Sequence, residues 1–101
     1  MTSIFIVQLE HGMYYVGESK DPVKRYEELV HGGGPTWTQI HRPLRFEKIT
    51  VSQPASSLDT FTKAAMKKYG VDRVRGGSWE SLRLSDADRH ALHDDSSCLL
   101  N

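Results

Sequence analysis

Apolar and polar residues follow a strand pattern over the first part of the chain. Residues 2–9 are rich in β-branched and aromatic side chains with partial alternation, which favours a β-strand. Residues 10–12 are turn formers, and residues 13–17 are again strand-like. The pattern therefore predicts that the chain begins with a β-hairpin.

A helical pattern follows this hairpin. Asp21 is a typical N-cap and Pro22 is typical of the first helical position. Apolar residues then recur at helical spacing, at Val23, Tyr26, Leu29 and Val30. The three glycines at residues 32–34 are expected to end this first helix.

The middle of the chain shows helical periodicity in some segments and strand-like alternation in another. Residues 36–41 indicate an irregular turn of helix, and residues 44–51 alternate like a half-buried strand. A second helix is predicted by an apolar stripe that consists of Leu58, Phe61, Ala65, Met66 and Tyr69. Gly70 is expected to close that helix.

The last part of the chain carries weaker signals. Residues 71–84 indicate an extended segment that Gly76 and Gly77 interrupt, and residues 85–92 a short helix with Ser85 as its cap. The order of elements predicts a single α+β domain built on an antiparallel sheet. Its core is expected within residues 1–84, followed in residues 85–101 by the short helix and a flexible acidic tail.

Composition narrows the class of protein. A chain of 101 residues can bury one modest core. Neither a membrane span nor a signal-peptide pattern is visible, so we expect an intracellular protein (cytoplasm, nucleus or nucleoid) that is neither secreted nor membrane-bound. The single cysteine, Cys98, excludes an internal disulfide and a cysteine-built zinc site. Among the five histidines only His90 and His93 have a metal-ligand spacing, and we interpret them as surface residues.

Charge leaves the choice of partner open. The formal net charge of the chain is zero, which argues against an obvious nucleic-acid binder. Residues 1–84 hold twelve Lys/Arg against nine Asp/Glu, whereas residues 85–101 hold four Asp against one Arg. A mildly basic body with an acidic tail permits phosphate binding without requiring it.

Several segments in order resemble one family. The run MYYVGESKDPVKRYEEL at residues 13–29 resembles the second signature and first helix of the GIY-YIG nuclease superfamily. The residues TWT at 36–38 and HRP at 41–43 resemble the next segment of its small single-domain members. Downstream, KYGVD and VRGGSW resemble a subgroup with these two elements in this order. The resemblance covers roughly residues 3–84.

The resemblance implies a three-stranded antiparallel sheet flanked by helices, and metal-dependent cleavage of DNA, as in DNA repair or recombination. By position, Tyr15 matches the second-signature tyrosine, a usual base or proton relay, and Arg25 matches the arginine that stabilises the phosphoryl charge. Mg²⁺, or Mn²⁺ in its place, would be held by a glutamate whose position falls on Asp59.

Three positions depart from the family pattern. Phe5 stands where the first signature has tyrosine, so a hydroxyl that could bind water or phosphate is missing. Asp59 is one methylene shorter than the expected glutamate. Glu18 adds a negative charge where related proteins often carry lysine. All three changes weaken the expectation of a fully active nuclease.

Candidate nucleic-acid contacts are Lys20, Lys24, Trp37, Arg42 and Arg75. Trp37 could stack on a base or cap the core, and each basic residue could equally be a solvated surface charge. Three functions stay open on these grounds: a DNA endonuclease, a catalytically inactive relative that still binds nucleic acid, and a protein-interaction module on the same fold.

Overall fold

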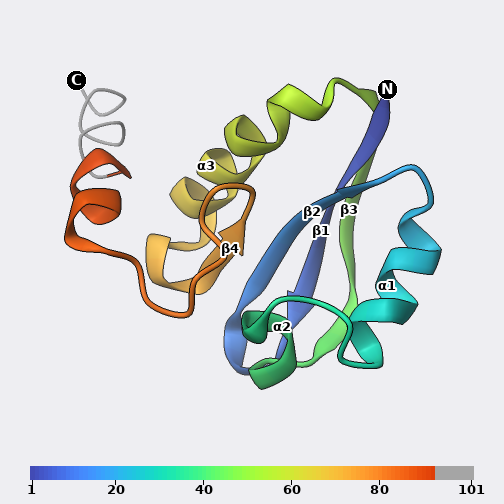
Figure 1. Cartoon of the computed structure of the whole chain (residues 1–101), viewed down its shortest axis with the longest axis horizontal. Coiled ribbons are helices and arrows are strands. Elements are labelled where there is room, and N and C mark those ends of the chain that lie inside the picture. Colours follow the sequence, from blue (N-terminus) through green and yellow to red (C-terminus); the bar gives the residue numbers. More distant parts are fainter. Residues whose placement is uncertain (93–101) are drawn as a thin grey trace.

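The centre of the protein, seen here in a computed structural model, is a four-stranded sheet with the strand order β3-β1-β2-β4 (Figure 1). The strands are β1 (Thr2–Leu9), β2 (Tyr14–Ser19), β3 (Pro43–Gln53) and β4 (Val74–Gly76). Strand β1 pairs antiparallel with β2 on one side and with β3 on the other, whereas β4 pairs parallel with β2. The structure describes residues 1–92.

The predicted α+β class is confirmed, but the predicted sheet of three antiparallel strands is wrong. The three strands β3, β1 and β2 are antiparallel as expected, and β4 adds a parallel fourth strand that makes the sheet mixed. Parallel neighbours require a long connection. Here residues 20–73, which contain three α-helices and β3, connect β2 to β4. Strand β4 has only three residues, ends at Gly76 and is followed by Gly77, so it has no periodic pattern from which this pairing could be predicted.

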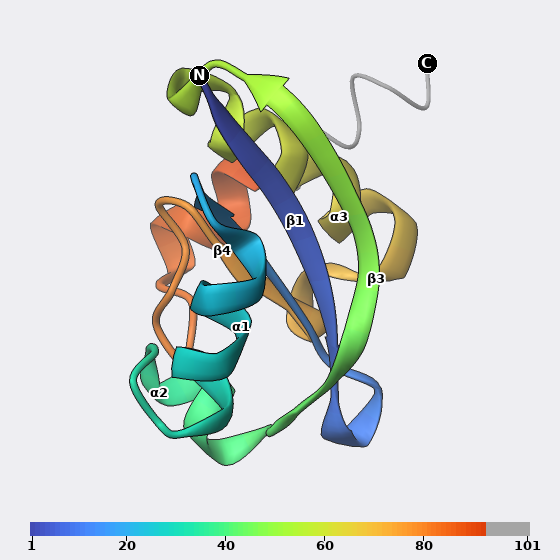
Figure 2. The same ribbon diagram turned by 90° about the vertical axis from the view of Figure 1, so that its right-hand side faces the viewer.

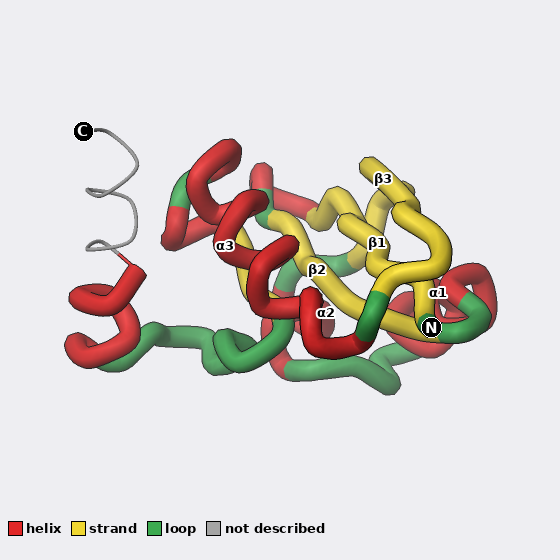
Figure 3. The backbone as a smooth tube through the Cα atoms, turned by 90° about the horizontal axis from the view of Figure 1, so that it is seen from above, coloured by secondary structure: helices red, strands yellow, loops and turns green. Residues whose placement is uncertain are grey.

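Helices cover both faces of the sheet. The α-helices are α1 (Pro22–Val30), α2 (Thr36–Ile40) and α3 (Leu58–Tyr69), with a further helix over residues 86–92. Figures 2 and 3 show α1 on one side of the strands and α3 on the other. Short 3₁₀ turns are η1 (Glu10–Gly12), η2 (Ala55–Ser57) and η3 (Val71–Arg73).

Two predicted helix starts, with Asp21 and Ser85 as N-caps, are confirmed. The Asp21 carboxylate accepts a hydrogen bond from the Lys24 amide at 3.2 Å, and Pro22 is the first residue of α1. The Ser85 hydroxyl oxygen likewise accepts from the Asp88 amide at 3.1 Å. Each side chain satisfies an amide that the first helical turn leaves without a backbone partner, which is why these local signals were readable.

Two apolar clusters lie on opposite faces of the sheet, because successive strand residues point to opposite sides. On the α3 face, the buried residues are Ile4, Val16, Ala65, Met66, Val74, Leu84 and Leu92. On the α1 and α2 face, they are Phe5, Val7, Leu9, Tyr15, Leu29 and Trp37. The second cluster contains three aromatic residues, Phe5, Tyr15 and Trp37, and all three were singled out from the sequence.

The structure describes the end of the chain only as far as residue 92. Leu84 and Leu92 are buried against the α3 face, so the helix at residues 86–92 packs on the same core as the sheet. Residues 93–101, which hold His93 and the part of the predicted acidic tail that contains Asp94 and Asp95, lie outside the described residues. No helix within residues 1–92 is both long and apolar enough to cross a membrane.

Candidate active site

Two aromatic rings meet over a glycine on the α1 face of the sheet. Phe5 lies opposite Gly17 in the register of β1 and β2, and Tyr15 precedes Gly17 by two residues on the same face. A methyl group on Gly17 would stand 2.7 Å from Phe5 Cζ and 2.9 Å from Tyr15 Cε2. Side chains do not tolerate such distances, so the glycine lets both rings approach the strand closely.

The Tyr15 hydroxyl ends at a carboxylate that the sequence did not point to. It donates a hydrogen bond of 2.7 Å to Oε2 of Glu80, which comes from the loop after β4. The Tyr15 ring is buried with 4% exposure, while Glu80 is exposed. A phenol inside the fold thus contacts a carboxylate at its surface.

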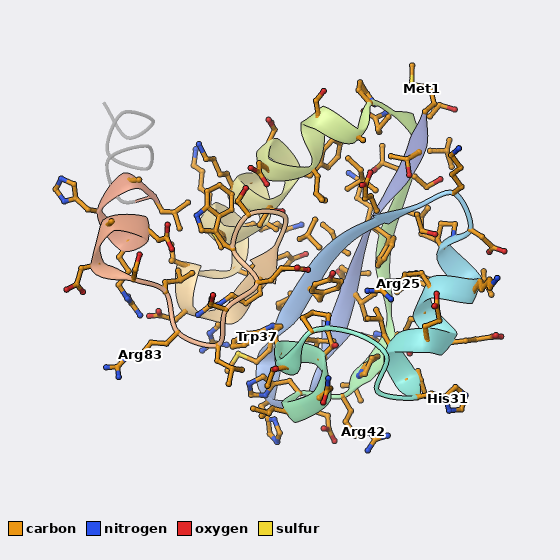
Figure 4. The ribbon with its side chains drawn as sticks, viewed as in Figure 1. Met1, Arg25, His31, Trp37, Arg42 and Arg83 are labelled. Atoms are coloured by element: carbon orange, nitrogen blue, oxygen red, sulfur yellow. The ribbon has the colours of Figure 1, made fainter. Side chains whose placement is uncertain are left out.

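Arg25 approaches the same hydroxyl from α1. Figure 4 shows its side chain pointing from α1 toward the sheet. Its Nη1 also lies 3.5 Å from the Gly33 carbonyl oxygen, a long contact with the loop that follows the helix. Tyr15, Arg25 and Glu80 therefore come together from a strand, a helix and a loop, and we call them the active-site cluster.

Electrostatics keep Tyr15 protonated. Burial raises the pKa of its hydroxyl above the ordinary value of 10.0, and the hydrogen bond to Glu80 and the charge of Glu80 raise this pKa further. The positive charge and hydrogen bonding of Arg25 lower the pKa, but they are the smaller effects. At neutral pH the hydroxyl consequently carries its proton and directs it at Glu80.

A tight turn brings Glu80 back toward β2. Gly76 and Trp79 exchange two backbone hydrogen bonds, each 2.8 Å long, which reverse the chain directly after β4. Gly77 has φ +53°, and a methyl group there would stand 2.1 Å from Asp59 Oδ1. Only glycine fits this position without displacing the Asp59 side chain from its contacts with the turn.

Asp59, the predicted metal ligand, contacts this turn. Its Oδ1 accepts from the Ser78 amide at 2.8 Å and its Oδ2 from the Ser78 hydroxyl at 2.6 Å. Both oxygens are thus engaged in holding the turn that leads to Glu80. Within residues 1–92, no three His, Cys, Asp or Glu side chains gather in a group that could hold a metal ion.

Arg75, a predicted phosphate contact, lies inside the protein with 2% exposure. Its guanidinium donates to the carbonyl oxygens of Val71, Val74, Ser81 and Leu82 at 2.9, 2.8, 2.7 and 3.1 Å. Its guanidinium carbon also lies 4.5 Å from the centre of the Trp37 ring. Because Ser81 and Leu82 follow Glu80 directly, Arg75 fixes the loop that presents this carboxylate.

Trp37 is also enclosed. Its exposure is 4%, and its Nε1 donates to the Tyr14 carbonyl oxygen at 3.0 Å. One face of the indole meets Arg75, so the ring packs in the core and supports Arg75. Of the two roles weighed for Trp37, the core role is the one this geometry fits.

The remaining predicted phosphate contacts lie on the surface. Lys20, Lys24 and Arg42 are exposed. The Arg42 side chain donates to the Val30 carbonyl oxygen at 3.1 Å, at the end of α1, and Figure 4 shows it at the outer edge of the molecule. Lys20 and Lys24 flank the start of the helix that carries Arg25.

Glu80 was missed because no local signal marks it. It lies in a segment that we expected to be extended, and it is brought to Tyr15 by the parallel pairing of β4 with β2. The pair of glycines before it indicates a turn, but not the strand beside which the turn ends.

Comparison with known proteins finds a relative of this chain. The chain is 31% identical over 66 residues to UPF0213 protein FN1575 of Fusobacterium nucleatum subsp. nucleatum. The match spans 65% of this chain and 65% of that protein, so about a third of each lies outside it. No protein-family model matches the chain. No solved structure matches it either.

Proposed function

We propose that this protein is a metal-dependent DNA endonuclease of the GIY-YIG type, with Tyr15, Arg25 and Glu80 as its active-site cluster. The observation that carries the proposal is the 2.7 Å hydrogen bond from the Tyr15 hydroxyl to Glu80, beside Arg25. The residues that the family resemblance singled out are thereby joined to a carboxylate, which the matched position alone did not provide.

Tyr15 handles the proton of the attacking water. Its own proton points at Glu80 Oε2, so its oxygen acts as an acceptor, toward Arg25 and, through its second lone pair, toward the attacking water. As the water oxygen bonds to phosphorus, its proton passes to Tyr15 while the proton of Tyr15 passes to Glu80. This relay suits a phenol with a raised pKa, because no free phenolate has to exist at neutral pH.

Arg25 stabilises the phosphate. Negative charge grows on the phosphoryl oxygens as the bond to the leaving sugar oxygen breaks, and a guanidinium can answer it with two parallel hydrogen bonds. The exposed Lys20 and Lys24 contribute attraction to the neighbouring phosphates of the strand. These contacts carry no sequence information, so they suit an enzyme that recognises the nucleic-acid backbone.

A divalent ion fits Glu80 better than Asp59. Mg²⁺ and Mn²⁺ prefer oxygen ligands, and Mg²⁺ often takes one or two carboxylates together with substrate phosphate and water. The Asp59 oxygens both accept hydrogen bonds from Ser78, whereas Glu80 is exposed and accepts from Tyr15 at Oε2. When bound, the ion would neutralise charge on the leaving oxygen.

A second candidate is a relative that binds DNA without cutting it. Phe5 is completely buried and contacts Tyr15 and Phe46 through its ring, with centroids 6.4 and 6.0 Å apart. It therefore preserves the packing of the first signature without a hydroxyl. This candidate predicts DNA binding that weakens with salt, and no cleavage with any metal.

Cleavage of a supercoiled plasmid and of a branched oligonucleotide tests the proposal, with Mg²⁺, Mn²⁺ or EDTA. We expect nicking that EDTA abolishes, and a loss of about 10²–10³-fold in Arg25→Ala and Glu80→Gln. Arg45→Ala and Glu47→Gln, which change exposed residues of β3, serve as matched controls and should cut normally. Undiminished cutting by Arg25→Ala would refute the assignment, and binding without nicking would favour the second candidate.

A further inference from the structure

Two histidines from distant parts of the chain face each other outside the active-site cluster. His11 lies in the η1 turn between β1 and β2, and His41 directly follows α2. Their Nδ1 atoms are 3.0 Å apart, and their ring centroids 5.2 Å apart. Neither residue showed a metal-ligand spacing in the sequence, because thirty residues separate them.

The backbone around the two histidines is held by several contacts. The Glu10 amide donates to the Arg42 carbonyl oxygen at 2.9 Å, and the Arg42 amide donates to Glu10 Oε1 at 3.0 Å. The edge of the His41 ring packs against Trp37, with centroids 4.6 Å apart. The turn and the segment after α2 are thus tied together independently of the imidazoles.

His11 adopts an uncommon conformation. Its φ of 65° and ψ of 23° lie in the left-handed region, which few residues other than glycine occupy. The next residue, Gly12, also has a positive φ of 73°, as is usual in a tight turn between two antiparallel strands. Here the conformation accompanies an imidazole nitrogen directed at the imidazole of His41.

We propose that His11 and His41 form a binding site for a transition-metal ion of the Zn²⁺, Cu²⁺ or Ni²⁺ class, held by the two Nδ1 atoms. Imidazole nitrogen suits these ions, whereas Mg²⁺ requires oxygen ligands. Metal–nitrogen bonds of about 2.0–2.1 Å at angles of about 90–110° place two nitrogens about 2.9–3.4 Å apart. The observed 3.0 Å lies in that range.

The surroundings of His41 favour its neutral form, which is the form that binds a metal. Burial and the neighbouring His11 lower the pKa of His41; the charge of Glu10 opposes this shift, and that of Arg75 adds to it. Near neutral pH the His41 ring therefore carries no charge that would repel a cation. The remaining coordination positions would be taken by water or by an external ligand, because the pair supplies two nitrogens.

A bound ion would join the β1–β2 turn to the start of β3. Since an unfolded chain does not hold two residues at this separation in place, the ion would bind the folded state preferentially and raise its stability. The site does not depend on the nuclease proposal, and Mg²⁺ is not expected to occupy it.

Isothermal titration with Zn²⁺, and separately with Cu²⁺, tests this site. All chains carry Cys98→Ser so that the thiol does not compete for metal. We compare the parent with His11→Ala and His41→Ala, and use His31→Ala, which removes an exposed histidine outside the pair, as the matched control. His11 is itself exposed, so its variant should fold even if His41→Ala does not.

The expected result is stoichiometric binding by the parent and by His31→Ala, with affinity at least about tenfold weaker in both pair variants. Mg²⁺ should give no heat that depends on the pair. Binding that survives His11→Ala unchanged would overturn the proposal. Absence of Zn²⁺ and Cu²⁺ binding by the parent would also overturn it, and would leave the pair as a hydrogen bond between two imidazoles.

Discussion

The two edges of the sheet are built in opposite ways. Strand β3 at one edge has eleven residues and is largely exposed, with apolar side chains at the surface that include Leu44, Ile49 and Val51. Strand β4 at the other edge has three residues, all of them buried. The residues proposed for chemistry gather beside β4, and none of them comes from β3.

This difference shows how a short edge becomes a site. The β3 edge carries Arg45, Glu47 and Lys48, charges of the kind that protect an open edge from pairing with another chain. The β4 edge is instead covered by its own continuation, which Arg75 and Asp59 hold back against the sheet. That covering loop carries Glu80 to Tyr15, so the same contacts that close the edge also complete the cluster.

The largest difference in stability is expected between two alanine variants, Arg75→Ala at the β4 edge and Arg45→Ala at the β3 edge. Arg75→Ala removes the donor from four carbonyl oxygens and the cation beside Trp37, and should lower the free energy of unfolding by roughly 3–5 kcal/mol. Arg45→Ala loses one exposed hydrogen bond to Gln8 and should change it by less than about 0.5 kcal/mol. Urea denaturation followed by circular dichroism measures both, and similar losses would contradict the comparison.

A smaller contrast is expected for two acidic residues. Asp59→Ala loses both hydrogen bonds to Ser78 and should lower the free energy of unfolding by about 1–2 kcal/mol, whereas Glu47→Ala on β3 should leave it within about 0.5 kcal/mol. Urea midpoints and plasmid cleavage are measured on the same samples. Cleavage abolished at an unchanged midpoint would instead identify Asp59 as a metal ligand.

The smallest contrast is expected in alkaline solution, between two tyrosines. Burial and Glu80 raise the pKa of Tyr15, and burial alone raises that of Tyr26, which packs on Phe46 of β3. Since the unfolded forms ionise near pH 10, stability should be fully present below about pH 10. Above it, stability should fall by up to about 1.4 kcal/mol per pH unit for each such group.

Urea unfolding between about pH 9 and 11 checks this expectation. Tyr15→Phe should flatten the alkaline loss more than Tyr26→Phe, because Tyr15 is more deeply buried and Glu80 raises its pKa further. Equal slopes in the two variants would mean that neither the deeper burial nor Glu80 raises the pKa of Tyr15 above that of Tyr26.

Much of the fold was predictable because its signals are local. The hairpin turn, the Asp21 and Ser85 caps and the apolar stripe of α3 each act within a few residues, and each was found where expected. Such features depend on backbone geometry that neighbouring residues impose on one another.

The site was less predictable. Tyr15 and Arg25 were chosen by their positions in a resemblance, and the structure brings them together; the carboxylate beside them is Glu80, whereas Asp59 holds a turn. Arg75 and Trp37 were weighed as nucleic-acid contacts, and the structure places them against each other in the interior. The charge and aromatic character of a side chain follow from the sequence, but its burial depends on which other segments of the fold pack against it.

The sequence alone indicated where strands and helices begin and which of their faces are apolar. It also identified Tyr15 and Arg25 as the candidate catalytic residues. Three-dimensional packing was needed to pair β4 with β2, to bury Arg75 under a covering loop, and to bring Glu80 to Tyr15 and His11 to His41. The reason is range: caps and periodicity act across a few residues, whereas these contacts join positions 30 and 65 residues apart. Their geometry exists only once the sheet has formed.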